Sequence, residues 1–240
     1  MRRGQFTSLL YPCFPTPNLR PILLLLAPDF KADSSQGEIK WHEYIEGKWA
    51  ILFSHPRDFT PVCTTELGVV ARLKREWESR GVVVAALSVD SAESHRAWIK
   101  DIEEINQTQV WYPIIADEDY AVSLKYGMID QTHISATGMP FTVRSVYFIG
   151  PDKRVKAIIT YPASTGRNFN EVLRVIDSLQ LTVKHQVATP ADWQRGGTCV
   201  VLPTIPTDKA KEIFAAGGIQ EVRPWLRLTP DPSSVAQKSE

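Results

Sequence analysis

Residues 49–67 of the chain read Trp49-Ala-Ile-Leu-Phe-Ser-His-Pro-Arg-Asp-Phe-Thr-Pro-Val-Cys-Thr-Thr-Glu-Leu67 and change character twice. Residues 49–54 form a short apolar run of the kind found in a buried strand. A loop with two prolines follows at residues 55–62. From Thr64 to Arg80 apolar residues recur at spacings of three and four, which predicts a helix. Strand, loop and helix in this order are typical of an α/β fold.

The same alternation continues on the C-terminal side of this segment. Further strands are predicted at residues 81–89, 114–116, 142–149 and 155–161, and further helices at residues 92–105, 119–126 and 168–181. Gly81 can cap the first helix, and Asp90 or Ser91 the second. Gly150-Pro-Asp-Lys153 is a hairpin turn between the last two strands. The alternation predicts a sheet with helices on both faces.

The two ends of the chain differ from this middle part. Residues 1–27 carry arginines and prolines but no acidic residue, so two interpretations stay open, a disordered extension with a first strand near Ile22 or a mitochondrial targeting segment. The expected location is therefore cytoplasmic or mitochondrial. Beyond Val183 many prolines and glycines predict a small appendage with one short helix at residues 207–214. The predicted parts are 1–27, 28–185 and 186–240.

Composition excludes several classes of protein. The 240 residues contain 27 Lys and Arg against 27 Asp and Glu, and this balance gives no reason to expect nucleic acid or an anionic membrane as a partner. The longest apolar run, residues 22–27, is far shorter than the ~20 residues that span a bilayer. Three cysteines are too few for a disulfide scaffold, and neither they nor the histidines have the spacing of a zinc or haem site.

Cys63 is the residue that points to chemistry. It stands at the first turn of the predicted helix, where unpaired N–H groups favour an anion and hence a reactive thiolate. Thr60 can direct a hydroxyl to the same point, and Pro56 and Pro61 stiffen the loop and remove N–H groups. On helix position alone, a buried structural cysteine is an equally good interpretation.

The surrounding residues resemble a known family. Pro56-x-x-x-Thr60-x-x-Cys63 matches the active-site signature of the peroxiredoxins, and HPRDFTPVCTTELG resembles their one-cysteine, peroxiredoxin 6-like subfamily. The resemblance runs from about Ala27 to about Pro230. It includes the blocks at residues 138–145, 161–168, 173–180 and 187–190, in the family's order.

The resemblance implies a fold and an activity. The fold would be thioredoxin-like, a central mixed sheet flanked by helices, with a small C-terminal dimerisation domain and a homodimeric assembly. The activity would be that of a thiol-specific peroxidase in antioxidant defence, which reduces hydrogen peroxide and organic hydroperoxides without a cofactor. Cys63 would attack the peroxide and become a sulfenic acid.

The resemblance also implies roles for the neighbouring residues. Arg144 would stabilise the thiolate and the charge that develops on the peroxide, Thr60 would hydrogen-bond the peroxide, and Pro56 would shield the pocket from water. In a supporting layer, Glu66 would orient the arginine and Arg167 would join the same network. Apart from the resemblance, His55 is adjacent to the signature and could tune Cys63 or line the pocket wall.

The sulfenic acid must then be reduced by another thiol. In two-cysteine members a resolving cysteine lies in a Val-Cys-Pro block, but the matching residues here are Val187-Ala-Thr-Pro190. This predicts a one-cysteine cycle with an external reductant such as glutathione or thioredoxin. Cys199 is expected to be structural, with a resolving role across a dimer left open, and Cys13 is expected to take no part.

Two alternatives and one departure complete the expectations. Cys63 could be the switch of a non-enzymatic redox sensor or chaperone-like dimer, or part of a Cys–His acyl-transfer site. Some family members also have phospholipase A2 activity, attributed to a serine, a histidine and an aspartate. His42 and Asp152 match two of these positions, but Lys48 replaces the serine. No phospholipase activity is expected by that route.

Overall fold

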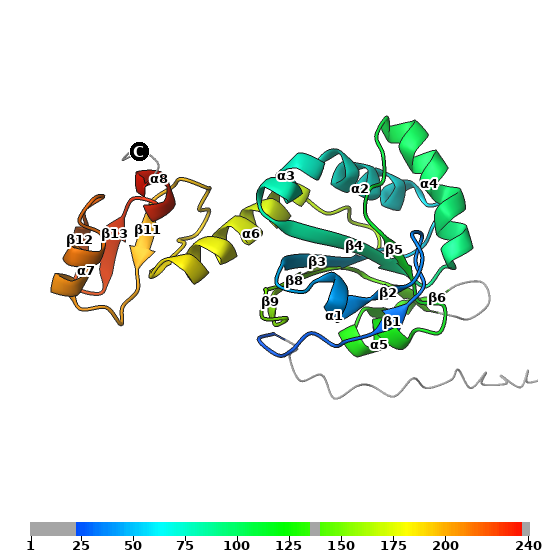
Figure 1. Cartoon of the computed structure of the whole chain (residues 1–240), viewed down its shortest axis with the longest axis horizontal. Coiled ribbons are helices and arrows are strands. Elements are labelled where there is room, and N and C mark those ends of the chain that lie inside the picture. The colour runs from blue at the N-terminus through cyan, green and yellow to red at the C-terminus, as the bar shows by residue number, and fades with distance from the viewer. Residues whose placement is uncertain (1–22, 135–139, 237–240) are drawn as a thin grey trace, which may run out of the picture. The chain divides into compact units, whose positions relative to one another are not determined.

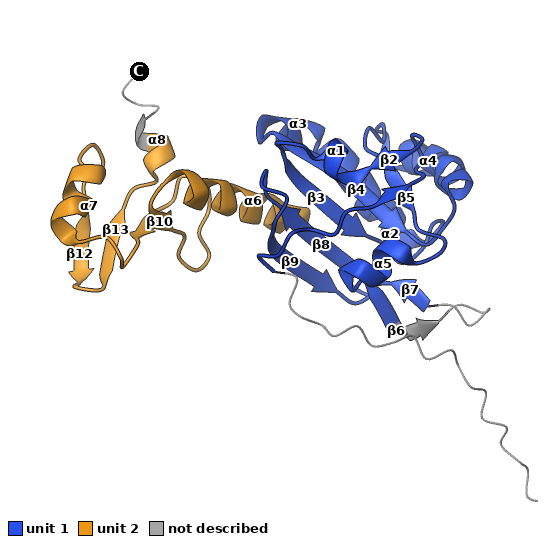
Figure 2. Cartoon of the chain, turned by 60° about the horizontal axis from the view of Figure 1, so that its bottom comes forward, with its two compact units in different colours: residues 1–167 blue, residues 168–240 orange. Residues whose placement is uncertain are grey.

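The computed structural model describes residues 23–134 and 140–236 (Figure 1). Cys13 and most of the predicted extension lie outside the described residues. The chain forms two compact units, which divide between Arg167 and Asn168 (Figure 2). The sequence placed a boundary between residues 185 and 186 instead. The difference is helix α6 (Phe169–Lys184), which groups with the C-terminal unit.

A five-stranded mixed sheet forms the centre of the first unit. Its order is β5 (Ile114–Ala116), β4 (Val82–Ser88), β3 (Trp49–Ser54), β8 (Arg144–Ile149) and β9 (Val155–Tyr161). The first three strands are parallel, while β8 runs antiparallel to β3 and β9 antiparallel to β8. All six residues of β3 are buried, as the apolar run predicted.

Helices cover both faces of this sheet (Figure 1). Ala50 and Leu52, which share one face of β3, pack in a core with residues of α1 (Trp41–Tyr44) and α5 (Ala121–Tyr126). On the other face, the ring of Phe53 lies 6.0 Å from that of Tyr112. The hydroxyl of Tyr112 donates to the carbonyl of Leu67 in α2 (Pro61–Arg72), which lies beside α4 (Ala92–Asn106). The predicted thioredoxin-like α/β class is confirmed.

The predicted helix over residues 64–80 is wrong in two details. It begins at Pro61, because proline has the right φ for a first helical position and no N–H to leave unpaired. It is also two helices, since Leu73, with ψ near 15°, separates α2 from α3 (Lys74–Ser79). Gly81 follows with φ +61°, which agrees with the predicted cap.

The N-terminal side of the sheet also differs from the expectation. Ile22, where a first strand was expected, lies outside the described residues, and from Leu23 a turn leads to a bridge between Leu26 and Arg154. The amide of Leu24 donates to the carbonyl of Val155 at 2.7 Å, so this segment lies along the start of β9. Four short strands were not predicted: β1 (Lys31–Ala32), β2 (Ile39–Lys40), β6 (Ile129–Ile134) and β7 (Pro140–Thr142).

The C-terminal unit has its own antiparallel sheet and core. The strand order is β10 (Val187–Ala188), β11 (Cys199–Val201), β13 (Leu226–Thr229) and β12 (Gln220–Arg223). The sheet is accompanied by α7 (Thr207–Ile213) and α8 (Pro232–Ala236). Besides α6, only α7 was predicted in this unit, and its strands of two to four residues are too short to show a period. None of the described helices is long and apolar enough to cross a bilayer.

Candidate active site

Cys63 is the third residue of α2, directly after the loop that leaves β3. The free N–H groups of the first turn create a positive potential beside its sulfur. Cys63 has no exposed surface. The sulfur is nevertheless not surrounded by apolar groups alone, because a guanidinium reaches it.

Arg144, at the start of β8, supplies that guanidinium. Its Nη1 lies 3.3 Å from Sγ of Cys63 and 2.8 Å from a carboxylate oxygen of Glu66. Its Nε and Nη2 donate to the carbonyl of Ala163 at 2.9 and 2.7 Å. The group is therefore held on two sides, and one N–H edge faces the sulfur.

A second arginine completes the cluster. Arg167 forms a bidentate ion pair with Glu66, with Nε–Oε1 and Nη2–Oε2 distances of 3.0 and 2.7 Å. Its Nη1 donates to the carbonyls of Ser54 and Ser145, and its guanidinium lies 5.0 Å from the centre of the Phe53 ring. These contacts fix Glu66 between two cations.

The charges of this cluster create a positive potential beside the sulfur. Burial by itself would raise the pKa of Glu66, but the charge and hydrogen bonds of Arg167, together with the charge of Arg144, outweigh it and hold the pKa below its ordinary value. Glu66 is therefore an anion between two guanidinium groups. The three side chains sum to one positive charge, and Nη1 of Arg144 brings it to 3.3 Å from the sulfur of Cys63.

Thr60 and Pro56 belong to the loop that precedes Cys63. Thr60 is the N-cap residue of α2, and its hydroxyl donates to the carbonyl of Arg57 at 2.9 Å. Because that proton is used, the oxygen remains an acceptor. Pro56 is buried. It removes one N–H from the loop at this depth.

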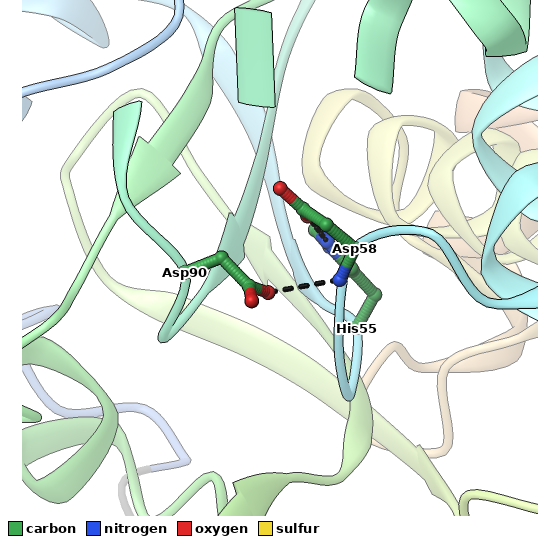
Figure 3. A group of neighbouring side chains, drawn as sticks. All are labelled: His55, Asp58 and Asp90. Carbon is green, nitrogen blue, oxygen red and sulfur yellow. Dashed lines mark hydrogen bonds and ion pairs between the residues drawn. The ribbon is translucent and has the colours of Figure 1, made fainter. Parts of the chain in front are cut away.

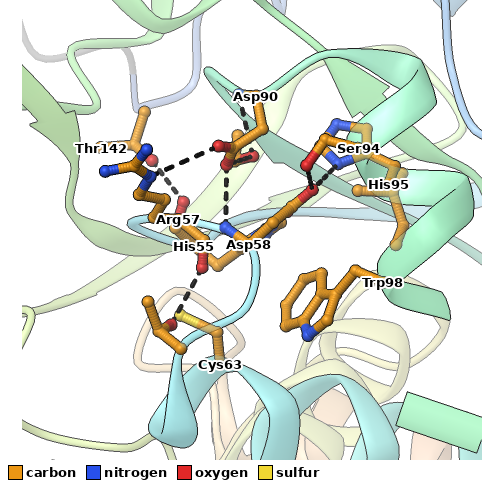
Figure 4. A network of polar contacts seen from close by, with 12 residues as sticks. His55, Arg57, Asp58, Cys63, Asp90, Ser94, His95, Trp98 and Thr142 are labelled. Atoms are coloured by element: carbon orange, nitrogen blue, oxygen red, sulfur yellow. Dashed lines mark hydrogen bonds and ion pairs between the residues drawn. The ribbon is translucent and has the colours of Figure 1, made fainter. Parts of the chain in front are cut away.

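His55 faces a buried carboxylate. Its Nε2 lies 3.0 Å from Oδ1 of Asp58, and its ring packs 5.3 Å from that of Trp98 (Figure 4). Its Nδ1 is buried and has no hydrogen-bond partner. The hydroxyl of Thr142 donates to its carbonyl at 2.5 Å. The structure thus brings His55 into a polar network beside the Cys63 loop.

Comparison with known proteins now identifies the family. Residues 25–158 match the family model of the AhpC/TSA family, and residues 178–215 match that of the C-terminal domain of 1-Cys peroxiredoxin. A 1-Cys peroxiredoxin of Dictyostelium discoideum is 51% identical over 208 residues, which are 87% of this chain and 84% of the relative. The chain belongs to the 1-Cys peroxiredoxins.

Further relatives agree with this assignment. Peroxiredoxin-6 of Gallus gallus is 50% identical over 86% of this chain and 96% of its own length. A crystal structure of a cysteine-to-serine variant of peroxiredoxin 6 from Arenicola marina superposes with a TM-score of 0.84, at 48% identity over 88% of this chain and 98% of that one. A yeast mitochondrial 1-Cys peroxiredoxin, studied for thiol resolution via glutathione and thioredoxin systems, gives 0.81 at 44% identity, covering 87% and 98%. Peroxiredoxins are thiol-dependent peroxidases, and the chain is therefore an enzyme of this class.

The sequence did not identify the partners of His55 in this peroxiredoxin. Asp58 accepts from His55, and its second oxygen accepts from Ser94 and His95 in α4 (Figure 4). Its backbone N–H donates to Asp90 at 2.8 Å. One signal was available, because Asp90 follows β4 and the loop follows β3, and carboxyl ends of neighbouring parallel strands meet at one sheet edge.

His55, Asp58 and Asp90 also have the spacing of metal ligands (Figure 3). One ligand atom of each lies within 4.8 Å of the others. Protein donors already account for the carboxylates, since one Asp90 oxygen accepts from Ser88 and the other lies 3.8 Å from Nε of Arg57. The spacing therefore follows from a hydrogen-bond network.

Proposed function

We propose that Cys63 is the nucleophile with which this peroxiredoxin reduces hydrogen peroxide and organic hydroperoxides. The observation that supports it is the 3.3 Å contact between Sγ and Nη1 of Arg144. The thiolate attacks one peroxide oxygen, the O–O bond breaks, and the other oxygen leaves as hydroxide or alkoxide and takes up a proton. The products are a sulfenic acid at Cys63 and water or an alcohol.

The other residues act on the charge and position of the reacting atoms. Arg144 faces the sulfur and the oxygens on which negative charge develops. The oxygen of Thr60 accepts a hydrogen bond from the peroxide, and Pro56 keeps water from the buried side of the loop. Glu66 and Arg167 fix the arginine, and His55 orders the loop wall.

We propose that the sulfenic acid is resolved by an external thiol. The block Val187-Ala-Thr-Pro190 lacks a cysteine. A thiol condenses with the sulfenic acid to give a mixed disulfide and water, and a second thiol releases Cys63 as a thiol. The glutathione and thioredoxin systems described for the yeast mitochondrial relative are the donors we expect. Cys199 is then structural.

The deciding experiment is stopped-flow consumption of hydrogen peroxide by the wild type and by Cys63→Ser. The wild type is expected to react, and equal rates would overturn the proposal. Sustained turnover with excess glutathione or thioredoxin separates the peroxidase from a redox sensor, which reacts once and stops. Hydrolysis of a model ester by Cys63 would instead support the acyl-transfer site.

We also expect a homodimer in the cytoplasm or the mitochondrion. Strand β9 is an edge strand of the central sheet, and Ile158 on it is exposed. Such an edge is suited to pairing with a second copy. Light scattering tests the assembly, and a fluorescent protein fused to residues 1–27 tests the location.

We predict no phospholipase A2 activity through the His42–Asp152 route. The Nε2 of His42 bonds the carbonyl of Ala27 at 2.8 Å, and Asp152 pairs with Lys156 at 2.6 Å. Lys48, an exposed ammonium at the serine position, cannot act as the hydroxyl nucleophile. Release of fatty acid from phosphatidylcholine by Cys63→Ser would contradict this prediction.

A further inference from the structure

The loop that carries the Cys63 site is fastened by one buried carboxylate. Only 1% of the Asp58 side chain is exposed. Its Oδ2 accepts from Nδ1 of His95 at 2.7 Å and from the hydroxyl of Ser94 at 2.8 Å, and its Oδ1 accepts from His55. Because Ser94 and His95 belong to α4, the carboxylate joins the loop to that helix.

The hydrogen-bond partners of Asp58 determine its charge. Burial would raise the pKa of Asp58, but the hydrogen bonds and charges of His55 and His95 outweigh it, so the pKa lies well below its ordinary value. Asp58 is therefore an acceptor only. The other nitrogen of His95, Nε2, lies 3.2 Å from the carbonyl of Ile115, which also only accepts. Both nitrogens of His95 therefore face acceptor oxygens, one on Asp58 and one on Ile115 of β5, and the ring is held between them.

The backbone directly after Asp58 is strained. Phe59 has φ +53°, a left-handed conformation that is unfavourable for an aromatic residue with a Cβ. Its side chain is 56% exposed, so burial of the ring does not offset the strain. Phe59 lies between Asp58 and Thr60, the N-cap residue of the Cys63 helix. The strained backbone of Phe59 is therefore maintained only while Asp58 is held in place.

We propose that Asp58 is a positioning residue for peroxide reduction. Hydrogen-bonded to His95, it holds Phe59 at positive φ and thereby sets Thr60 and the first turn of α2, on which Cys63 stands. This inference rests on the proposed role of Cys63 as the nucleophile. If the inference holds, loss of the Asp58 charge allows the backbone of Phe59 to relax. Asp58 itself contacts neither the sulfur nor the substrate.

The first test is Asp58→Asn, measured as the second-order rate constant for hydrogen peroxide. We expect a loss of about 100-fold, since a displacement near 1 Å costs that much at a reacting centre. The matched control is Asp117→Asn. Asp117 is also buried and accepts from the backbone amides of Val122 and Ser123 in α5, which contributes no residue to the site. If Asp58→Asn folds and its rate constant is within threefold of that of the control, the proposal is overturned.

The second test separates positioning from a general loss of structure. Asparagine tolerates positive φ better than phenylalanine. In a Phe59→Asn background, Asp58→Asn should therefore cost only about tenfold, which a double-mutant cycle measures. An equal loss in both backgrounds would overturn the proposal.

A third measurement needs no variant and decides the case if Asp58→Asn does not fold. Side-chain ¹⁵N spectra of the reduced wild type should show a proton on Nδ1 of His95, which donates to Asp58. An Nδ1 without a proton would overturn the proposed pairing. Full activity in Cys63→Ser would instead refute the proposed function, while leaving the His95 spectrum as expected.

Discussion

Cys63 and Cys199 are both fully buried, yet their electrostatic surroundings are opposite. Cys63 stands at a helix N-terminus, with Nη1 of Arg144 3.3 Å from its sulfur. Cys199 stands in strand β11, where burial first and then the charge of Asp231 raise the pKa of its thiol to about 11. Its sulfur lies 3.6 Å from the carbonyl of Gly197, an acceptor that suits a thiol.

The contrast shows that burial by itself does not decide what a cysteine does. Both side chains have lost contact with water, but one faces a cation and the other faces an anion and a carbonyl oxygen. The charge beside Cys63 is positive, whereas at Cys199 burial first and then the charge of Asp231 favour the neutral thiol. Four measurements test this difference.

The largest effect should come from removing each sulfur in turn. Cys63→Ser should lower the rate of peroxide reduction by at least about 10³-fold, because the nucleophile is lost. Cys199→Ser should stay within about twofold of the wild type, since burial and then the charge of Asp231 raise the pKa of that thiol and make it unreactive. Stopped-flow kinetics measures both. A comparable loss in the two variants would show that the contrast does not govern reactivity.

Removing the cation beside Cys63 should have the next largest effect. Arg144→Gln should slow the peroxide reaction by about 10²- to 10³-fold, the range typical of a lost charge-stabilising donor. Arg144→Lys should recover only part of the rate, because an ammonium cannot contact both Cys63 and the carbonyl of Ala163 in the same geometry. Full activity of the lysine variant would show that a positive charge is sufficient and that the planar guanidinium with its several donors is not required.

Glu66→Gln should mainly reduce stability. It leaves two buried guanidinium groups without their shared carboxylate, at a cost of about 3–5 kcal/mol in the free energy of unfolding. The folded-state pKa of Glu66 is lowered, so its contribution is complete above the ordinary glutamate pKa and is lost as the pH falls through the folded value. In urea unfolding, the free energies of unfolding of the wild type and Glu66→Gln should converge as the pH falls below 4.5, the ordinary pKa of glutamate. A constant difference would contradict this.

The smallest effect is expected at Cys199. Asp231→Asn, in a Cys63→Ser background, should raise the iodoacetamide labelling rate of Cys199 by no more than about tenfold, the equivalent of one pKa unit. Burial, the larger cause of the raised pKa, is unchanged. Asp208→Asn, an exposed change in the same unit, is the control, and peptide mass spectrometry is the measurement. Labelling as fast as that of a free thiol would show that Cys199 is accessible.

The sequence predicts those helices and strands whose periodic pattern or apolar run extends over many residues. Strand β9 has the predicted bounds, 155–161, and α4 differs from its prediction by one residue. The division of α2 from α3 depends on the backbone of a single leucine, which no pattern records. The sheet of the C-terminal unit is built from strands too short for a periodic signal.

The site shows the same limit. The family signature locates Cys63 and Thr60, and further blocks locate Arg144 and Arg167. The structure adds the carbonyl of Ala163 as a second group that holds Arg144. Every residue type has a backbone carbonyl, so the sequence could not indicate this contact. Asp58 lies within the signature, but its pairing with His95 joins segments 37 residues apart and requires the folded chain.

The full burial of the Cys63 sulfur has a consequence for the order of events in catalysis. A small oxidant needs only a brief fluctuation to reach it, whereas a tripeptide or a protein thiol needs room for its own backbone. The two half-reactions therefore require different amounts of local opening. Reduction of the sulfenic acid by such a thiol is therefore expected to depend more strongly on local opening than its formation by peroxide does.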